Sequence, residues 1–178
     1  RGYTPEILTK FNVGESTGIE MYNRVVVPIY DEFGNFVGCS GRNLIDSEKY
    51  PKWIHSENFN RNNYLYGLNF AKDHIISSSK VFLVESPGDV WRAFQAGIYN
   101  VVGIFGISLS DNQKILLEKT GATKVIILTN FNEGPGERGA KKIAEKLQRT
   151  FTVIRPAFEY NDLGDSPIDI LYNFLRSF

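Results

Sequence analysis

From about residue 79 onward, the spacing of apolar and polar positions alternates between that of strands and that of helices. Each short apolar run is followed by a segment in which apolar residues recur every three or four positions. The expected strands are residues 80–85, 100–106, 124–130 and 151–157, and the expected helices are residues 86–97, 108–121, 133–148 and 166–178. This alternation predicts an α/β fold with a mainly parallel sheet flanked by helices.

The first part of the chain has a different pattern. Residues 24–42 alternate β-branched and aromatic side chains around residues 31–35, which is typical of a hairpin. A turn-rich segment and then a short expected helix at residues 65–75 follow. We therefore expect two units, a smaller mixed α+β subdomain over residues 1–77 and the α/β domain over residues 78–178.

Local signals mark the ends of several expected helices. Three pairs have capping-box spacing, with a proline at the first helical position in two of them, namely Ser86 to Asp89 with Pro87, Ser110 to Gln113, and Ser166 to Asp169 with Pro167. Gly97 and Gly121 stand where two of these helices are expected to stop.

Composition narrows the class of protein. The chain has 178 residues, 42% of them hydrophobic, and its 20 basic and 20 acidic side chains cancel, so any nucleic-acid binding must come from local clusters of charge. Cys39 is the only cysteine, which excludes an internal disulfide and a cysteine-based zinc cluster and favours a reducing compartment such as the cytoplasm. Residues 1–4 read as neither a signal peptide nor a natural start, so we expect a piece of a longer protein.

Oxygen-bearing side chains gather just after three of the four expected strands. These are Glu85 and Asp89 after the first, Asn130 and Asn132 after the third, and Asp162 and Asp165 after the fourth. Ligands of open parallel sheets bind beyond the carboxyl ends of the strands, where such side chains converge. Hard oxygen ligands of this kind suit Mg²⁺ or Mn²⁺ organising phosphate groups.

Several of these residues also have a purely structural interpretation. Asp89 fits the third position of a capping box, and Asp165 fits the start of the last helix. Asn130 and Asn132 fit an ordinary turn. Glu85 ends an apolar strand and caps nothing obvious, which favours a functional role.

Taken together, these motifs resemble the TOPRIM domain of bacterial-type DNA primases, a fold shared with type IA and type II topoisomerases. That family has Glu-Gly-x-x-Asp after one strand, Asp-x-Asp after another and a late acidic pair. Here VESPGDV supplies Glu85 and Asp89, with Ser86 in place of Gly, and NDLGDSP supplies Asp162 and Asp165. The segment NVVGIFGISLSDNQ resembles the turn after the second strand.

The first part of the chain resembles the rest of the primase polymerase core. RGYTPEILTKFNVG, the hairpin RVVVPIYDEFGNFVGCSGR, PKWIHSENF and LYGLNFAK match its segments in order. The resemblance implies primer synthesis, a nucleotidyltransferase reaction that joins ribonucleoside triphosphates on single-stranded DNA with divalent metal ions. By the same resemblance, a zinc-binding module and a helicase-binding region are missing here.

The resemblance also implies residues that grip template and nucleotide. They are Arg24, Arg42, Lys52, Trp53, which replaces a Tyr, and His55, which replaces an Asn. Basic side chains neutralise phosphates and aromatic rings stack on bases, although each of these residues alone is also compatible with an ordinary surface or core position.

Asn130 and Asn132 stand where the family has Asp. Each change removes one negative charge, and a close charge pair at an effective dielectric of about 20 is worth on the order of 4 kcal/mol before desolvation is offset. The chain is then a natural variant that binds metal through its remaining carboxylates, a deliberately inactivated form, or a lineage that kept only nucleic-acid binding. The longer turn after Asn132 favours natural divergence, as in a phage primase.

Two other functions remain open at this point. One is a non-catalytic, primase-like scaffold that binds single-stranded DNA. The other is a TOPRIM nuclease, which would leave the first part of the chain unexplained.

Overall fold

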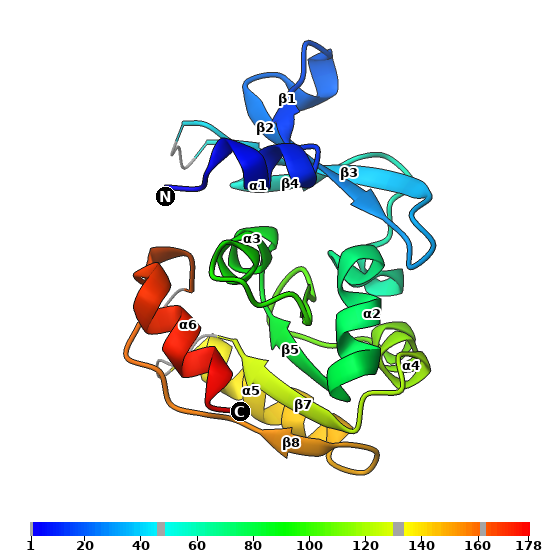
Figure 1. Cartoon of the computed structure of the whole chain (residues 1–178). Helices are drawn as coiled ribbons and strands as arrows, with labels where there is room; N and C mark the ends of the chain where they lie inside the picture. The colour runs from blue at the N-terminus through cyan, green and yellow to red at the C-terminus, as the bar shows by residue number, and fades with distance from the viewer. Residues whose placement is uncertain (1, 46–48, 130–133, 161–162) are drawn as a thin grey trace.

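The computed structural model describes residues 2–45, 49–129, 134–160 and 163–178. Within them lie two four-stranded sheets, an antiparallel one in the order β1-β2-β3-β4 and a parallel one in the order β6-β5-β7-β8. The antiparallel sheet lies above helix α3 in Figure 1, and the parallel sheet lies below it. The α/β architecture predicted from the sequence is confirmed.

The antiparallel part begins with α1 (Pro5–Lys10), β1 (Gly14–Glu15) and the 3₁₀ helix η1 (Ile19–Met21). The predicted hairpin is formed by β2 (Arg24–Tyr30) and β3 (Phe36–Asn43), and Asp31 closes its turn with hydrogen bonds to the backbone amides of Phe33 and Asn35. β4 (Trp53–His55) then pairs with β3, so that Ser40 lies opposite His55 and Arg42 lies opposite Trp53. This register brings distant residues to one edge of the sheet.

The connection to the second sheet consists of η2 (Arg61–Asn63) and α2 (Leu68–Ser78). The parallel part then alternates as the sequence predicts, with β5 (Lys80–Val84), α3 (Pro87–Gln95), β6 (Val101–Gly103), α4 (Asp111–Lys119), β7 (Lys124–Leu128), α5 (Pro135–Leu147), β8 (Thr152–Ile154), η3 (Leu163–Asp165) and α6 (Ile168–Arg176). In the described part of the chain, no helix has the length and apolar character needed to cross a bilayer.

The central strands are buried on both faces, which explains their continuous apolar sequence. Phe82 and Val84 of β5 belong to a core shared with α1, α3, α6 and the hairpin, whereas Val81 and Leu83 belong to a core shared with α2, α4 and α5. Helix α2 therefore packs on the parallel sheet although nearly all of it belongs to the predicted first unit, residues 1–77. The division into units at residues 1–77 and 78–178 stays a prediction.

The helix ends agree with the predicted signals in all but one case. Ser86 with Asp89 and Ser110 with Gln113 form complete capping boxes, and Gly97 and Gly121 have φ of 78° and 73° at the predicted stops. The predicted capping box at Ser166 is wrong. The Ser166 hydroxyl donates to the carbonyl of Leu163 at 2.7 Å and so completes η3, while Pro167 is the N-cap of α6 rather than its first residue.

Candidate functional site

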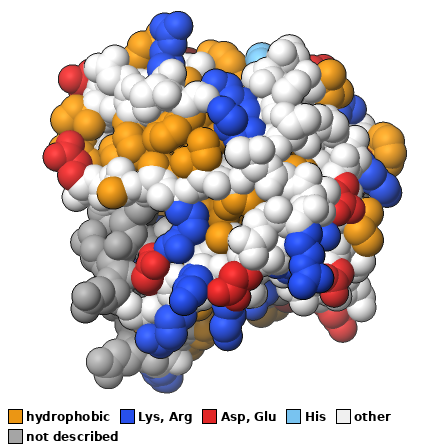
Figure 2. Space-filling view, turned by 90° about the horizontal axis from the view of Figure 1, so that it is seen from below, with side chains coloured by type: hydrophobic (Ala, Val, Ile, Leu, Met, Phe, Trp, Pro, Cys, Tyr) orange, Lys and Arg blue, Asp and Glu red, His pale blue; other side chains and the backbone are white. Residues whose placement is uncertain are grey.

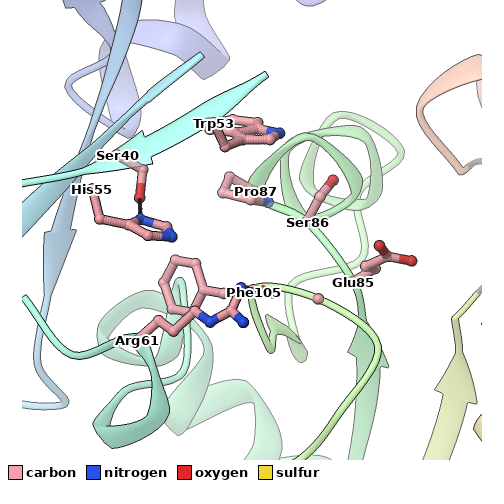
Figure 3. A pocket seen from close by; sticks show the side chains of 9 residues that line it. Ser40, Trp53, His55, Arg61, Glu85, Ser86, Pro87 and Phe105 are labelled. Atoms are coloured by element: carbon pink, nitrogen blue, oxygen red, sulfur yellow. Dashed lines mark hydrogen bonds between the residues drawn. The ribbon is translucent and has the colours of Figure 1, made fainter. Parts of the chain in front are cut away.

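A pocket of about 120 Å³ lies between the two sheets, at the carboxyl end of β5. Figure 3 shows the side chains around it, which come from β3, β4, η2, the turn after β5 and the loop after β6. They are Ser40, Trp53 and His55 of the antiparallel sheet, Arg61 of η2, Glu85, Ser86 and Pro87 after β5, and Phe105 after β6. The place agrees with the rule that parallel sheets bind ligands beyond the carboxyl ends of their strands.

His55 forms one wall of this pocket and is held by the strand opposite. Its Nδ1 lies 2.7 Å from the hydroxyl oxygen of Ser40, its partner in the β3–β4 register (Figure 3). Burial, and secondly the positive charge of Arg61, lower the pKa of His55 below its ordinary value. Because the ordinary pKa of histidine is about 6.5, the imidazole is neutral at pH 7 and presents a ring with one N–H donor and one acceptor.

Phe105 and Arg61 form the adjoining wall. Phe105 has a φ of 60°, a left-handed conformation that is costly for a bulky side chain, and the Arg61 guanidinium donates to its carbonyl at 3.0 Å. The ring packs edge-on against His55 and Phe59, with centroid separations of 6.4 and 5.7 Å. Such backbone strain concentrates at binding sites, where the surrounding contacts over-determine it.

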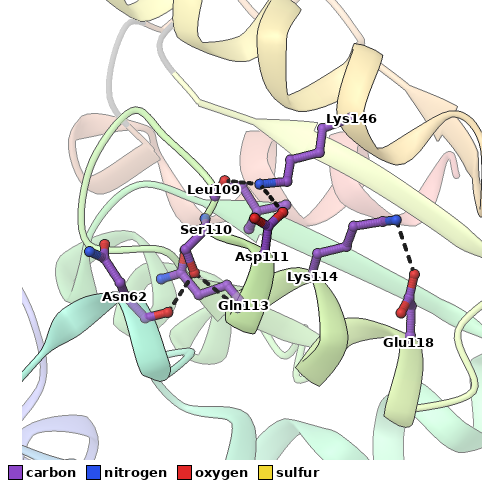
Figure 4. Close-up of polar contacts among 8 residues, drawn as sticks. All are labelled: Asn62, Leu109, Ser110, Asp111, Gln113, Lys114, Glu118 and Lys146. Atoms are coloured by element: carbon purple, nitrogen blue, oxygen red, sulfur yellow. Dashed lines mark hydrogen bonds and ion pairs between the residues drawn. The ribbon is translucent and has the colours of Figure 1, made fainter.

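The start of α4 holds η2, and with it Arg61, in place (Figure 4). The Gln113 side chain is 1% exposed, and its amide donates to the carbonyls of Arg61, Tyr64 and Ile104 at 3.0–3.2 Å. The Ser110 hydroxyl donates to the carbonyl of Asn62 in the same turn. Gln113 thus connects the loop after β6 to η2, although its own side chain does not line the pocket.

The predicted acidic edge is only partly described. Glu85 directly follows β5 and lines the pocket, and its carbonyl accepts a hydrogen bond of 3.1 Å from the amide of Gly106. Asp165 lies in η3, which Arg92 of α3 holds through a hydrogen bond of 3.1 Å to the carbonyl of Gly164. The predicted metal ligands Asn130, Asn132 and Asp162 lie outside the described residues.

Asp89 is 6% exposed, and its carboxylate accepts hydrogen bonds from the amide and the hydroxyl of Ser86 at 2.9 and 2.8 Å. The structural role predicted for it is therefore present, and a metal role stays a prediction. Over residues 2–45, 49–129, 134–160 and 163–178, no three His, Cys, Asp or Glu side chains form a group able to hold a metal ion. The carboxylates of Glu85 and Asp165 have the right donor chemistry for Mg²⁺ or Mn²⁺, but they do not complete a ligand set among these residues.

The predicted basic residues differ in their surroundings. Arg24 is 8% exposed and donates to the carbonyls of Gly41 and Pro51 at 3.0 and 3.1 Å, so it anchors the hairpin. Arg42 lies over the ring of Trp53, 5.8 Å from its centroid, and Lys52 is exposed beside them. Arg42 and Lys52 are therefore better placed than Arg24 to meet a phosphate, and the three binding roles stay predictions.

Comparison with known proteins agrees with this arrangement. The family model of the N-terminal domain of the DNA primase catalytic core matches residues 4–72, and that of the Toprim domain matches residues 79–157. The chain belongs to the DNA primase catalytic-core family. A DNA primase of Aquifex aeolicus is 33% identical over 138 residues, which are 76% of this chain and 27% of that protein. One from Helicobacter pylori strain 26695 is 31% identical, over 95% of this chain and 31% of its own length. The chain thus spans about a quarter to a third of the length of these primases.

Solved structures of primases share the fold. A crystal structure of the zinc-binding and RNA polymerase domains of the Aquifex aeolicus primase covers 99% of this chain with a TM-score of 0.86 and 27% identity, and this chain covers 52% of it. The structure of a DnaG primase catalytic domain bound to ssDNA covers 99% of this chain with a TM-score of 0.79, and this chain covers 68% of it. At 19% sequence identity, this similarity supports the fold alone.

Sequence reasoning named Trp53, His55 and Glu85, and the structure brings these three to one pocket. It missed Ser40, Arg61 and Phe105. Arg61 had no signal beyond being a basic residue in a turn-rich segment, and Phe105 looked like one more apolar residue after a strand.

Proposed function

We propose that this primase-family chain carries out template-directed joining of ribonucleoside triphosphates on single-stranded DNA, which produces short RNA primers for DNA replication. One observation carries the proposal. A carboxylate at the end of a parallel strand, Glu85, lines the same pocket as a neutral imidazole, an arginine and two aromatic rings. A nucleotide needs this combination, with flat apolar surface for its base and charge for its phosphates.

The side chains of the pocket divide naturally between these two tasks. Trp53, His55 and Phe105 offer ring faces to a base, and the neutral His55 also offers hydrogen-bonding nitrogen. Arg61 uses Nη1 for the Phe105 carbonyl, which fixes the direction of the guanidinium toward the pocket. Its remaining donors suit a phosphate group.

Along the β3–β4 edge, Arg42 and Lys52 would contact the template backbone. Stacking on Trp53 holds the Arg42 guanidinium, so less freedom is lost when it meets a phosphate. Arg24 remains in the proposal as a residue that shapes this edge, because its guanidinium is buried against backbone carbonyls.

A divalent ion, Mg²⁺ or Mn²⁺, would be held by oxygen-bearing side chains at the carboxyl ends of the parallel strands, namely Glu85, Asn130, Asn132, Asp162 and Asp165. Asp89 would lie beside these ligands. Such an ion, when bound, neutralises charge on the phosphates and stabilises the leaving pyrophosphate. Among the carboxylates of this set that the structure describes, Glu85 alone also lines the pocket. It is therefore the residue to test first.

The test is primer synthesis on single-stranded DNA with Mn²⁺ or Mg²⁺, comparing the wild type with Glu85→Gln. The variant keeps the shape of the side chain and removes its charge, so primer yield should fall while single-stranded DNA binding persists. Glu118→Gln is the matched control, because Glu118 is exposed on α4 and pairs with Lys114 at 3.2 Å. Unchanged primer yield in Glu85→Gln would remove Glu85 from the scheme.

A second function is favoured by one sequence feature, the two amides at positions 130 and 132. A chain weakened in metal binding could serve as a primase-like scaffold that binds single-stranded DNA without synthesis. The double variant Asn130→Asp with Asn132→Asp separates the two. If synthesis appears or rises strongly, the amides impair an enzyme; if nothing changes although DNA binding persists, the scaffold is the better description. A nuclease would instead cleave DNA, and it fits poorly with the primase-type match over residues 4–72.

The proposal extends to cellular context. A primase of this kind works in the cytoplasm of a bacterium or a phage-infected cell and cooperates with a replicative helicase. Co-purification of the chain with single-stranded DNA and a helicase from the same host would test this step.

A further inference from the structure

The hydroxyl of Ser40 determines which nitrogen of His55 carries the proton. Ser40 is 1% exposed, and within the described part of the chain its hydroxyl makes one hydrogen bond, to Nδ1 of His55 at 2.7 Å. A neutral imidazole has one donor nitrogen and one acceptor nitrogen. If Nδ1 carried the proton, it would donate to the Ser40 oxygen, and the hydroxyl hydrogen would stay buried without an acceptor, at the desolvation cost of an unpaired donor. The Ser40 hydroxyl therefore donates to Nδ1.

This hydrogen bond places the proton of the imidazole on Nε2. Nε2 has no hydrogen-bond partner among the residues that the structure describes, and it lies on the side of the ring that faces the pocket (Figure 3). Because the pKa of His55 is lowered, the ring is neutral at pH 7, and the tautomer is then set by the Ser40 hydroxyl. His55 thus presents a donor, and not an acceptor, to a ligand.

The neighbouring polar groups of the pocket do not supply an acceptor on this side. Arg61, whose Nη1 donates to the carbonyl of Phe105, has only donors and forms no ion pair with a described carboxylate. The Ser86 hydroxyl is used within its own capping box. The carboxylate of Glu85 lies across the pocket from His55 (Figure 3). The wall formed by His55 and Arg61 therefore consists of N–H donors.

A wall of donors distinguishes between the nucleobases. Guanine presents two neighbouring acceptors, N7 and O6, whereas adenine has its N6 amino group, a donor, beside N7. Two N–H donors match the guanine edge and oppose the amino group of adenine. This edge faces the major groove in a duplex, so it stays accessible when the base pairs with a template.

Charge alone would not select a base, because phosphates are common to all nucleotides. On the face that lies lowest in Figure 1, basic and acidic side chains of the described residues are interspersed rather than gathered by sign (Figure 2). That face therefore offers no broad positive field that would compete with the pocket for a nucleotide. Selectivity has to come from single groups that meet the edge of the base.

We propose that Ser40 positions His55 as an Nε2–H donor, which together with Arg61 selects guanine over adenine in the pocket, while Trp53 offers a ring face to the base. This inference rests on the nucleotide binding proposed above and names the base that the pocket prefers. The guanine belongs either to a nucleoside triphosphate or to a DNA strand, because both present the same edge.

The first measurement reads the tautomer directly. The ¹⁵N chemical shifts of the imidazole, recorded at pH 7 without nucleotide, distinguish a protonated from an unprotonated ring nitrogen. His74, the only other histidine, is exposed on α2 and serves as internal reference. In the wild type the proton should be on Nε2 of His55, and in Ser40→Ala both tautomers should be populated. The control Ser77→Ala removes an exposed hydroxyl of α2 and should leave the His55 signals unchanged.

The second measurement compares bases by titration in Mg²⁺. GTP should bind at least about tenfold more tightly than ATP, the scale of one well-formed bidentate contact. ITP keeps both O6 and N7 and should resemble GTP, whereas 7-deaza-GTP lacks the N7 acceptor and should lose most of the preference. A parallel arm uses short thymine oligonucleotides that carry one guanine or one adenine. The arm in which guanine is preferred identifies the source of the base.

Two variants test the residues. Ser40→Ala and His55→Phe should bring the affinities for guanine and adenine to within about threefold of each other, because the fixed donor is lost while the ring faces and the arginine remain. A purely structural role of Ser40 would instead weaken both ligands by the same factor. Thermal unfolding of each variant shows that it is folded, and the comparison of GTP with ATP and 7-deaza-GTP on the wild type does not depend on any variant.

Several results would overturn the inference. One is a proton on Nδ1 of wild-type His55, and another is a ratio of guanine to adenine affinity that stays the same in Ser40→Ala. Equal affinities for the two bases in both arms would overturn it and leave the proposed function standing if primers are still made. No binding in either arm, at concentrations sufficient for a Kd of about 1 mM, would overturn it too. Only the additional absence of primer synthesis would refute the proposed function.

Discussion

Replacing Asp89 with Asn changes a carboxylate into an amide of nearly the same shape at the start of α3. The sequence allows two roles for this residue, a helix cap and a metal ligand. Asp89 is 6% exposed, and its carboxylate accepts hydrogen bonds from both the amide and the hydroxyl of Ser86. The substitution separates the two roles because only one of them operates without metal.

The size of the effect follows from the contacts. The Ser86 N–H and hydroxyl both donate to the same carboxylate oxygen, so the amide oxygen of Asn can still accept from them, but the charge assistance of these bonds is lost. One charge-assisted hydrogen bond is worth about 1.5–3 kcal/mol. For a chain of this size, about 2 kcal/mol corresponds to a fall in Tm of roughly 4–8 °C.

The assay is thermal and denaturant unfolding of wild type and Asp89→Asn in EDTA, repeated with Mg²⁺. The expected loss of stability should be the same under both conditions. Asp111→Asn is the matched control, since Asp111 is also in the first turn of a helix but is exposed, and only a small change is expected there. Equal stability of Asp89→Asn and wild type in EDTA, with a difference that appears only on adding Mg²⁺, would refute the capping role and make Asp89 a metal ligand.

Three further predictions test how the pocket is built. Gln113→Leu should lower the free energy of unfolding by about 2–4 kcal/mol, because the carbonyls of Tyr64 and Ile104 lose their side-chain donor and that of Arg61 keeps only the Tyr64 amide. Nucleotide binding should weaken with it, and denaturant unfolding and a binding titration measure the two effects. Gly139→Ala should destabilise the protein by about 1–3 kcal/mol despite the better helix propensity of Ala, because the added Cβ would lie 2.3 Å from the carbonyl oxygen of Ile107. The control Lys142→Ala, on the exposed face of α5, should not lower the stability. The pKa of His55 is lowered in the folded state. The contribution of neutral His55 to stability is therefore fully present above the unfolded pKa of about 6.5 and is lost as pH falls through the lower folded value. His55→Asn should flatten that part of the stability-versus-pH curve.

The regular parts of this fold were predictable because local rules dominate there. The alternation of apolar runs and amphipathic segments placed every strand of the parallel sheet, since strands buried on both faces must be continuously apolar. The capping signals of Ser86 and Ser110 worked for the same reason. Ser166 failed because a nearby 3₁₀ turn competes for its hydroxyl, and capping-box spacing alone does not reveal such a competitor.

The pocket was less predictable because its contacts are long-range. Ser40 became a site residue only through the β3–β4 register that sets it opposite His55. Arg61 depends on Gln113, 52 residues away in the sequence, and Phe105 depends on a left-handed backbone that no sequence pattern announced. Arg24 shows the reverse case, a basic residue that the resemblance assigns to the template but that the fold buries against carbonyls.

The proposed binding of nucleic acid requires exposed positive charge on a chain whose net charge is zero, and these contacts provide it. The guanidinium group of Arg61 donates to a backbone carbonyl, and that of Arg42 lies on a ring. Neutral partners fix the direction of a guanidinium without cancelling its charge, whereas a carboxylate would do both. Because the architecture rests on such bonds, the shape of the pocket should change little with salt, while binding of single-stranded DNA should weaken steeply as counterions compete for the phosphates.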